Sequence, residues 1–462
     1  MSTLVVEPAV RAGGLTENAV RRDALIRLNR LWGIASRVAT TLLGFLSVHL
    51  AIRYFGAERY GVWLALSTIP GWLALLELGL GPLLRNRIAQ ASAGEDAAQI
   101  RRLASASFRS LARAALAAGA IALLVIPRLP WSRWVGAEGV PPAALVAAAG
   151  WLTAAGIASL PLLVAGHVAV GLQRGYLMEL CQLASVAAVA AGLWLLNAAA
   201  PNGSWLAGVL VLGVVPQLML LLFFAAFFAA PAFRALRPSW QRSGAEALAG
   251  TAGARALFFG LHGASLMVAL GESWVILHVA NAGVVAQAGV VQRWYLPVAM
   301  LHSILLTPLH PAYAEAMSRG DHAWSRRTLA RFSVLSWVLI GAFGVLLLLT
   351  QPLYVRLIGQ GAVASDAWLG VLYGLRMIEN AVGGSYATFL LATGRVGRLL
   401  AYNLLGAISY VPLALWLGRG GGAAGVVLAG LLAYLPVAVS NWRQATRMLR
   451  PAAGQPSTEP VG

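Results

Sequence analysis

The chain has 462 residues, of which 59% are hydrophobic and only 11% are charged, so it lacks the polar surface of a soluble protein of this size. Its 34 basic residues are all arginine and contribute to a formal net charge of +18, and the absence of lysine excludes a Walker A loop and a lysine Schiff base. The single cysteine, Cys181, excludes a disulfide framework within the chain and a cysteine metal cluster.

Twelve apolar stretches follow one another from residue 31 to residue 441, and each is long enough to cross a lipid bilayer as a helix. They predict an all-α polytopic membrane protein, because the strands of a membrane β-barrel are shorter and alternate apolar with polar residues. Residues 1–30 contain five arginines and no cleavable apolar region, which predicts a cytoplasmic amphipathic N-terminus. The predicted spans are residues 31–52, 61–84, 106–127, 144–170, 178–198, 205–230, 255–280, 284–310, 328–352, 367–392, 399–417 and 423–441.

Two basic loops in different halves of the chain resemble each other. The first contains Ile88-Ala-Gln-Ala91, Gly94-Glu-Asp96 and Arg101-Arg102, and the second contains Tyr313-Ala-Glu-Ala316, Gly320-Asp321 and Arg326-Arg327. Their outer matches lie 225 residues apart, and each loop follows two predicted spans and precedes four more. This spacing predicts a parallel duplication of a six-span unit around a central cavity, an arrangement typical of transporters.

The duplication divides the chain into an N-lobe at 31–230 (spans 1–6) and a C-lobe at 255–442 (spans 7–12), joined by a cytoplasmic linker at 231–254 and followed by a cytoplasmic tail at 443–462. With the N-terminus in the cytoplasm, 25 of the 34 arginines lie in cytoplasmic segments or at their helix edges, six lie outside and three lie within spans. This bias predicts that both termini are cytoplasmic. The positive charge is therefore interpreted as contact with anionic membrane lipids, and nucleic acid is not an expected partner.

Three arginines lie within predicted spans, where a charge costs about 2.5–3.5 kcal/mol on insertion scales and therefore needs a reason. Arg293, which is near Gln287 and Gln292, is too deep to reach the surface, so these three residues are predicted to line a polar cavity. Arg37 is predicted either to extend to the cytoplasmic surface or to line the same cavity. Arg376 lies three residues before Glu379 on one helical face, as a self-neutralising pair or, the interpretation we favour, as a cavity-facing cation with a titratable partner.

Together, Arg37, Arg293 and Arg376 are predicted to bind a diphosphate, because a guanidinium group stays ionised and meets phosphate oxygens two at a time. Glu77, Glu272 and Glu379 are candidates for taking up a proton in a coupled transport cycle. Glu77 is also close enough in sequence to pair with Arg85, and Glu272 to lie at the membrane interface. No metal-ligand spacing, catalytic triad or phosphate-binding fingerprint is present in the sequence, so no catalytic residue, metal or cofactor is expected.

Several stretches of this sequence resemble a known family of transporters. Tyr60-Gly-Val-Trp63, Glu77-Leu-Gly-Leu-Gly-Pro-Leu-Leu-Arg-Asn-Arg-Ile-Ala89 and Gly94-Glu-Asp96 resemble the second span and the following loop of polysaccharide-transporter flippases. Pro311-Ala-Tyr-Ala-Glu-Ala316 with Arg319-Gly-Asp321 resembles the matching loop of the second lobe. These flippases are a branch of the multidrug/oligosaccharidyl-lipid/polysaccharide exporter superfamily. Family members more often carry aspartate where this chain has Glu77, so the resemblance transfers no coupling role to that residue.

The resemblance covers the chain from about residue 25 to residue 442 and implies two six-helix lobes around a cavity that opens alternately to each side. It implies that the cargo is an undecaprenyl-diphosphate-linked precursor of an O-antigen or exopolysaccharide, flipped from the cytoplasmic to the periplasmic leaflet of the bacterial inner membrane. Coupling to protons or to the membrane potential, as in an antiporter, is implied too. The expected partners are the lipid-linked glycan, a polysaccharide polymerase and other biosynthesis proteins.

Two alternative functions are also compatible with the sequence. A multidrug exporter of the same fold would carry cations and should favour buried acids, whereas the deep charges here are more often basic. A polytopic glycan enzyme, such as a ligase, a polymerase or a glycosyltransferase, would need a sizeable outer loop with catalytic residues, and it would leave the repeat unexplained. The short outer loops favour a transporter that is not an enzyme.

Overall fold

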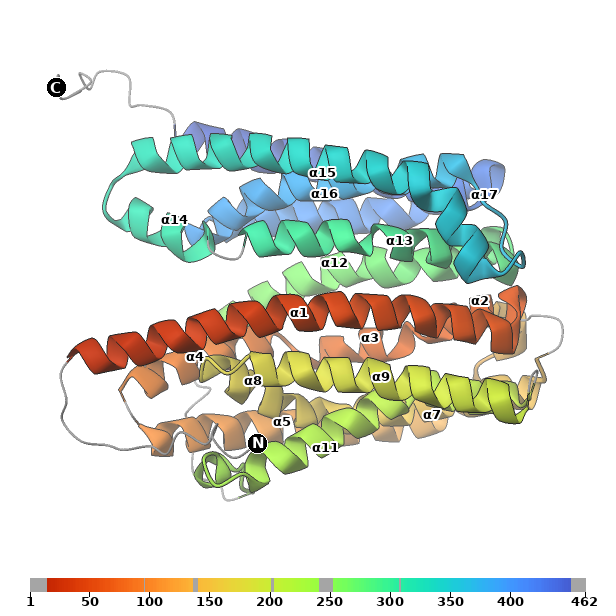
Figure 1. Ribbon diagram of the computed structural model, residues 1–462, viewed down its shortest axis with the longest axis horizontal. Helices are drawn as coiled ribbons and strands as arrows, with labels where there is room; N and C mark the ends of the chain where they lie inside the picture. Colours follow the sequence, from red (N-terminus) through yellow and green to blue (C-terminus); the bar gives the residue numbers. More distant parts are fainter. Residues whose placement is uncertain are drawn as a thin grey trace.

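The computed structural model describes residues 15–94, 96–135, 140–200, 203–240, 252–306 and 309–449, and within these ranges all regular structure is helical. Figure 1 shows the helices in two bundles lying side by side, the N-terminal half (red to green) in one and the C-terminal half (green to blue) in the other. Much of the predicted linker and tail, and the first 14 residues of the predicted amphipathic N-terminus, lie outside the described residues.

In the N-lobe, the predicted spans correspond to helices that are interrupted in four places, one of which is the turn at Ser67 and Thr68. The second span bends by 52° at Leu78 and Gly79, which both have left-handed backbone angles (φ 51° and 71°). Pro161 and Pro216 lie at the other two interruptions. Proline interrupts a helix because it lacks the N–H group that would donate the next backbone hydrogen bond. The elements are α1 (Leu15–Phe55), α2 (Ala57–Leu66), α3 (Ile69–Leu73), η1 (Ala74–Glu77), α4 (Leu80–Ala93), α5 (Ala97–Val125), η2 (Ile126–Arg128), α6 (Trp131–Val135), α7 (Pro142–Ser159), η3 (Leu160–Leu162), α8 (Leu163–Gly171), α9 (Tyr176–Ala199), α10 (Trp205–Gly213), α11 (Val215–Ala229) and η4 (Arg234–Leu236).

The C-lobe contains longer helices. Its last two predicted spans form one element, α17, that turns at Gly422, where the backbone angles are not helical (φ 54°, ψ −137°). Glycine tolerates this conformation because it has no Cβ. The elements are α12 (Ala252–Val279), α13 (Ala282–Leu306), α14 (Leu309–Ser318), α15 (His322–Gly359), α16 (Ala367–Ala392) and α17 (Val396–Met448).

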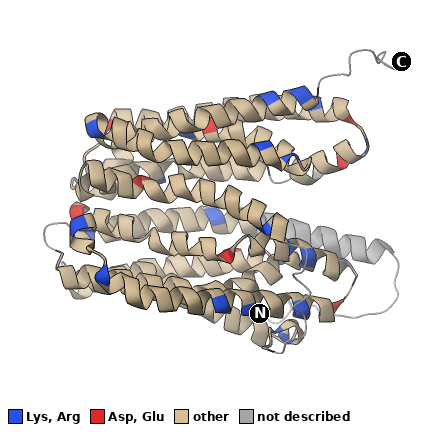
Figure 2. Cartoon of the chain, turned by 180° about the vertical axis from the view of Figure 1, so that it is seen from behind, with Lys and Arg blue, Asp and Glu red and all other residues tan. Residues whose placement is uncertain are grey.

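The helices fit a protein that crosses a membrane many times. Among the described residues, eight helical segments are long and apolar enough to do so, and the bent pair of residues 57–77 and 80–92 would be a ninth. Counting the two arms of α17 separately, and adding α13 and α16 with their polar residues Arg293, Arg376 and Glu379, gives the twelve predicted helices. Figure 2 shows that charged residues lie mostly near the two ends of the bundles.

The repeat seen in the sequence is visible in the local structure. Asp96 caps the start of α5 by accepting a hydrogen bond from the backbone N–H of Gln99 at 2.7 Å, and Asp321 caps α15 in the same way through Trp324 at 2.9 Å. The two aspartates occupy matched positions in the repeat. We call the end of the molecule that holds both caps the basic end, and the end with the α1–α2 and α12–α13 turns the distal end.

Candidate functional site

The two lobes meet most closely where α2 packs against α13, near the distal end. A Cβ atom added at Gly61 would lie 1.7 Å from the carbonyl oxygen of Ala282, and one added at Gly289 would lie 2.4 Å from a methyl group of Leu64. The absence of a side chain at these two glycines therefore allows the backbones to approach each other. The distal end of the interface is closed in this structure.

Two further contacts join the lobes on either side of this junction. On one side, the indole N–H of Trp274 on α12 donates a hydrogen bond to the hydroxyl of Thr68 at 2.7 Å. On the other side, α1 meets α15, where the amide of Gln360 donates a hydrogen bond to the carbonyl oxygen of His49 at 3.0 Å. Toward the basic end, the ribbons of α1 and α13 diverge (Figure 1). The lobes are thus joined distally, and α12 also contacts the N-lobe nearer the basic end, where the Nε–H of Arg255 donates a hydrogen bond to the carbonyl oxygen of Leu78 at 3.4 Å.

Arg293 lies on α13 at this junction, half-buried, and no described carboxylate forms an ion pair with it. It lies close enough to Tyr60 on α2 and Tyr354 on α15 to interact with both electrostatically. The two tyrosine hydroxyls are buried and have no hydrogen-bond partner among the described residues. Unsatisfied buried hydroxyls are costly, and these two lie near a guanidinium group that has no described carboxylate partner. We call these three groups the Arg293 cluster.

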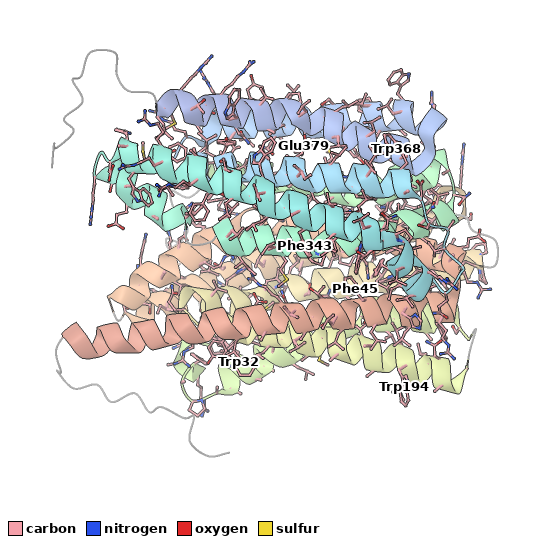
Figure 3. The ribbon with its side chains drawn as sticks, turned by 45° about the horizontal axis from the view of Figure 1, so that its top comes forward. Trp32, Phe45, Trp194, Phe343, Trp368 and Glu379 are labelled. Atoms are coloured by element: carbon pink, nitrogen blue, oxygen red, sulfur yellow. The ribbon has the colours of Figure 1, made fainter. Side chains whose placement is uncertain are left out.

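Aromatic side chains form one wall beside the Arg293 cluster. The rings of Trp294 and Tyr354 are stacked with centroids 4.3 Å apart, and Phe45 of α1 packs against both rings at 5.7 and 5.2 Å. The indole N–H of Trp294 donates a hydrogen bond to the carbonyl oxygen of Leu347 at 2.8 Å, which fixes its ring. Phe45 thus brings the N-lobe into the wall, and its position between the lobes can be followed in Figure 3.

The two glutamines predicted beside Arg293 have different surroundings. The amide of Gln287 donates a hydrogen bond to the carbonyl oxygen of Ala364 at 3.0 Å and so ties α13 to the segment before α16. Gln292 is half-buried and is adjacent to Arg293 in sequence. The contact of Gln287 is a structural one. That both glutamines line a cavity stays a prediction.

Arg376 is paired differently from the sequence expectation. Its guanidinium group binds the carboxylate of Glu272 on α12, and the hydroxyl of Tyr373 donates a hydrogen bond to the same carboxylate. The guanidinium packs against Gly430 of α17, where an added Cβ would lie 3.3 Å from its Cζ. The predicted pairing of Arg376 with Glu379 is therefore wrong, because α12 brings a carboxylate into the lobe interior. The side chain of Glu272 is 3% exposed, so this acid is buried inside the lobe.

Glu379 is left without a described partner. Both carboxylate oxygens are buried and accept no hydrogen bond from any described residue. The residue lies within the C-lobe, near Tyr434 of α17 and Arg376, and away from the junction at Phe45 (Figure 3). Glu77 and Glu272, the other two coupling candidates, each have a described partner, whereas Glu379 has none.

Arg37 and Glu77 are each held within the N-lobe. Arg37 forms an ion pair with Glu179 of α9 at 2.9 Å, and 40% of its side chain remains exposed. Glu77 lies 2.6 Å from the Nε2 atom of His167 on α8. The expected pairing of Glu77 with Arg85 is wrong, since the Nε–H of Arg85 donates to a backbone carbonyl instead.

The three predicted arginines do not share a contact in the described structure. Two of them have carboxylate partners inside separate lobes, and Arg293 is the one at the lobe junction. Five residues that complete these contacts were not predicted as site residues from the sequence: Tyr60, Tyr354, Glu179, His167 and Tyr373. The available signal was their polarity within apolar stretches, but only helix packing shows which of them face one another.

No protein-family model and no curated protein matches the sequence. Among solved structures, the lipid II flippase MurJ in an inward closed conformation aligns with a TM-score of 0.68 at 13% identity, over 90% of this chain and 87% of that chain. An inward-facing multidrug resistance MATE family transporter of the MOP superfamily aligns with a TM-score of 0.65 at 15% identity, over 88% and 94%. An outward-facing one aligns with a TM-score of 0.53 at 13% identity, over 90% and 95%. These likenesses show the fold, two lobes of six membrane helices.

Proposed function

We propose that this protein is a flippase that moves an undecaprenyl-diphosphate-linked oligosaccharide or polysaccharide precursor from the cytoplasmic to the periplasmic leaflet of a bacterial inner membrane. Both termini would lie in the cytoplasm, so the basic end would be the cytoplasmic end. The structurally similar protein MurJ is a flippase of lipid II. The fold gives this chain the same two-lobe framework.

The observation that carries the proposal is the Arg293 cluster. A guanidinium group placed between the lobes beside two hydroxyls, all three without a polar partner among the residues that the structure describes, offers several donors to the oxygens of a phosphate group. A cation carrier would gain nothing from a positive charge at this point. We therefore assign the diphosphate contact to Arg293, with Tyr60 and Tyr354 as additional donors from the two lobes.

The other predicted arginines take a supporting role in this proposal. The charges of Arg37 and Arg376 are already compensated by Glu179 and Glu272. Each pair links helices of one lobe, so each lobe would move as a unit during alternating access. Transport would then require the closed distal contacts to separate while the lobes close at the basic end.

The closed distal end suggests which state of the cycle this structure represents. If the basic end is cytoplasmic, a molecule that is joined at the distal end, and in which α1 and α13 diverge toward the basic end, faces inward. In agreement, the inward-facing MATE structure aligns better than the outward-facing one, with TM-scores of 0.65 and 0.53. The lipid tail of the cargo would leave the cavity laterally between the two lobes.

A multidrug exporter of the same fold is the second candidate, and one observation favours it. Glu379 is a buried acid without a described partner, which is the type of group that a cationic drug or a coupling proton would neutralise. In the flippase proposal, we assign Glu379 the coupling role instead, because Glu77 and Glu272 already have partners. The two candidates differ in what accumulates when the protein is missing.

The test is deletion of the gene followed by complementation. We expect the deletion strain to lose surface polysaccharide and to accumulate lipid-linked precursor in the inner leaflet, without a change in sensitivity to cationic drugs. Arg293→Ala should fail to restore export, and Arg293→Lys should restore it in part, because lysine keeps the charge but not the two-pronged geometry. Arg356→Ala is the matched control, an exposed arginine on α15 two residues after Tyr354.

Normal surface polysaccharide in the deletion strain, with increased sensitivity to cationic drugs, would support the exporter instead. Normal export by Arg293→Ala at wild-type protein level would remove the phosphate role of the Arg293 cluster. The amount of each variant in the membrane is measured in parallel, so that loss of protein is not mistaken for loss of transport.

A further inference from the structure

A cavity of about 680 Å³ lies near the distal end, on the α12 side of the lobe junction and apart from the Arg293 cluster. Four of its lining residues are tryptophans, contributed by both lobes: Trp72 of α3, Trp131 and Trp134 of α6, and Trp274 of α12. Its volume is within the range of about 300–1,000 Å³ that is typical of small-molecule sites. We call it the tryptophan cavity.

Two of these indole rings are held in fixed orientations. The N–H of Trp131 donates a hydrogen bond to the carbonyl oxygen of Ile126 at 2.7 Å, and the N–H of Trp274 donates to the hydroxyl of Thr68 at 2.7 Å. Trp134 packs edge-to-face against Trp131, with ring centroids 6.0 Å apart. Rings that are fixed before a ligand arrives lose little entropy on binding, so their faces form a preorganised surface.

The polar residues of the cavity limit the type of ligand. Arg133 and His278 line it, and neither side chain has a hydrogen-bond partner among the described residues. None of the lining residues that the structure describes is acidic, which disfavours a cationic ligand. Tryptophan faces together with a few free donors are suited to a sugar ring, since its C–H bonds pack on the negative face of an indole and its hydroxyl groups accept hydrogen bonds.

We propose that the tryptophan cavity is a glycan-binding site that holds a neutral or acidic sugar ring at the distal end of the lobe junction. Trp72 and Trp134 stack on the ring, Arg133 and His278 bind its hydroxyl or carboxylate oxygens, and Trp131 and Trp274 form the fixed walls. This binding does not depend on the proposed function. If the protein is a flippase, the site meets the glycan on the side to which it is delivered.

The site is built from both lobes, so its occupancy is linked to the conformation of the protein. Trp274 belongs to the C-lobe and is held by Thr68 of the N-lobe. When the lobes separate distally, this bond breaks and the walls of the cavity move apart. A bound glycan therefore stabilises the distally closed state, since a ligand shifts an equilibrium toward the state that binds it better.

Direct binding tests the proposal, using the full chain in nanodiscs and three soluble probes: maltotriose, chitotriose and trigalacturonate. Saturation-transfer NMR identifies the sugar protons in contact with the protein, and calorimetry gives the affinity. We expect at least one probe to bind, Trp72→Ala and Trp134→Ala each to weaken binding by about tenfold or more, and Trp72→Phe to retain most of it. Trp194→Ala is the control, because Trp194 is 61% exposed on α9 and projects away from the N-lobe (Figure 3).

Three results would overturn the proposal. The first is that no probe binds up to its solubility limit, and the second is that Trp194→Ala and Trp134→Ala lose equal binding affinity. The third is that glycerophosphoglycerol displaces the bound sugar at a lower concentration than a competing sugar does. The last result would assign the cavity to lipid headgroups, and the second would make these tryptophans ordinary interfacial residues. The two proposals can fail separately. If the protein binds the probe in this cavity but deletion of its gene leaves surface polysaccharide intact, the glycan site stands and the flippase function is refuted.

Discussion

Arg376 of α16 and Glu272 of α12 form an ion pair in the interior of the C-lobe, with side chains that are 11% and 3% exposed. Tyr373, one turn before Arg376, donates a hydrogen bond to the same carboxylate. Two buried charges compensate each other only while both are present, because removing one leaves the other unpaired in a medium of low dielectric constant. Unlike a surface ion pair, this pair therefore destabilises the lobe strongly when only one of its two charges is removed.

The first prediction concerns this pair. Glu272→Ala should destabilise the protein by about 3–5 kcal/mol, because it leaves the guanidinium group of Arg376 buried without a counter-charge. The measurement is thermal unfolding of the purified protein in detergent, followed by the loss of monodisperse protein. The double variant Glu272→Leu/Arg376→Met should recover much of the loss, since no buried charge remains. A single variant as stable as the wild type would show that the pair is not buried as described.

The second prediction concerns the bend of the second span. A methyl group at Gly81 would lie 2.1 Å from Oε1 of Glu77 and 2.7 Å from Cε1 of His167, so Gly81→Ala must displace this pair. We expect a loss of about 1–3 kcal/mol, typical of overpacking a filled interior. The matched control is Gly119→Ala in α5, where an added Cβ meets nothing within 4 Å and alanine favours the helix. Equal melting temperatures for the two variants would contradict the pairing of Glu77 with His167.

The third prediction uses the close contact between the lobes. Gly61→Ala places a methyl group 1.7 Å from the carbonyl oxygen of Ala282, which should force α2 and α13 apart and favour a distally open state. Spin labels on Glu58 and Ala362, introduced as cysteines after Cys181→Ala, report the distance between the lobes by electron paramagnetic resonance. We expect a population at longer distance in Gly61→Ala.

The control for this experiment is Gly44→Ala in α1, where an added Cβ has no neighbour within 4 Å. This variant should give the wild-type distribution of distances. An unchanged distribution in Gly61→Ala as well would show that the distal contact does not determine the conformation.

Much of the fold could be predicted from the sequence, because length and hydropathy are local properties. The twelve apolar stretches correspond to helices, and the repeat of two basic loops marks matched caps at Asp96 and Asp321. The predicted ends differ where polar residues continue a helix beyond the apolar stretch. The span predicted at 328–352, for example, lies within α15, which extends from His322 to Gly359.

The partners of the buried charges could not be predicted in this way. Arg37 and Glu179 are 142 residues apart in the sequence, and their contact depends on how α1 and α9 rotate against each other. Arg376 and Glu379 share a helical face, but proximity along one helix was a poor guide, because the neighbouring helix α12 provides a better-placed carboxylate. The Arg293 cluster depends on three helices from both lobes, and no spacing in the sequence contains that information.

The last prediction distinguishes the two acids of the C-lobe. Glu379→Leu should raise the free energy of unfolding by about 1–3 kcal/mol, because it removes a buried carboxyl group that has no described partner and replaces it with an apolar side chain. Glu272→Leu should have the opposite effect. Both are measured as shifts of the thermal unfolding midpoint of the purified protein.

A group that lowers stability where it stands is retained for another reason, and coupling of transport is the reason proposed for Glu379. Glu379→Leu should therefore lose transport of the lipid-linked precursor while the protein becomes more stable and remains abundant in the membrane. Glu379→Gln, which keeps the shape but cannot carry a charge, should lose transport as well. Full transport by both variants would remove the coupling role, and a lower unfolding midpoint for Glu379→Leu would show that the carboxylate has a stabilising partner.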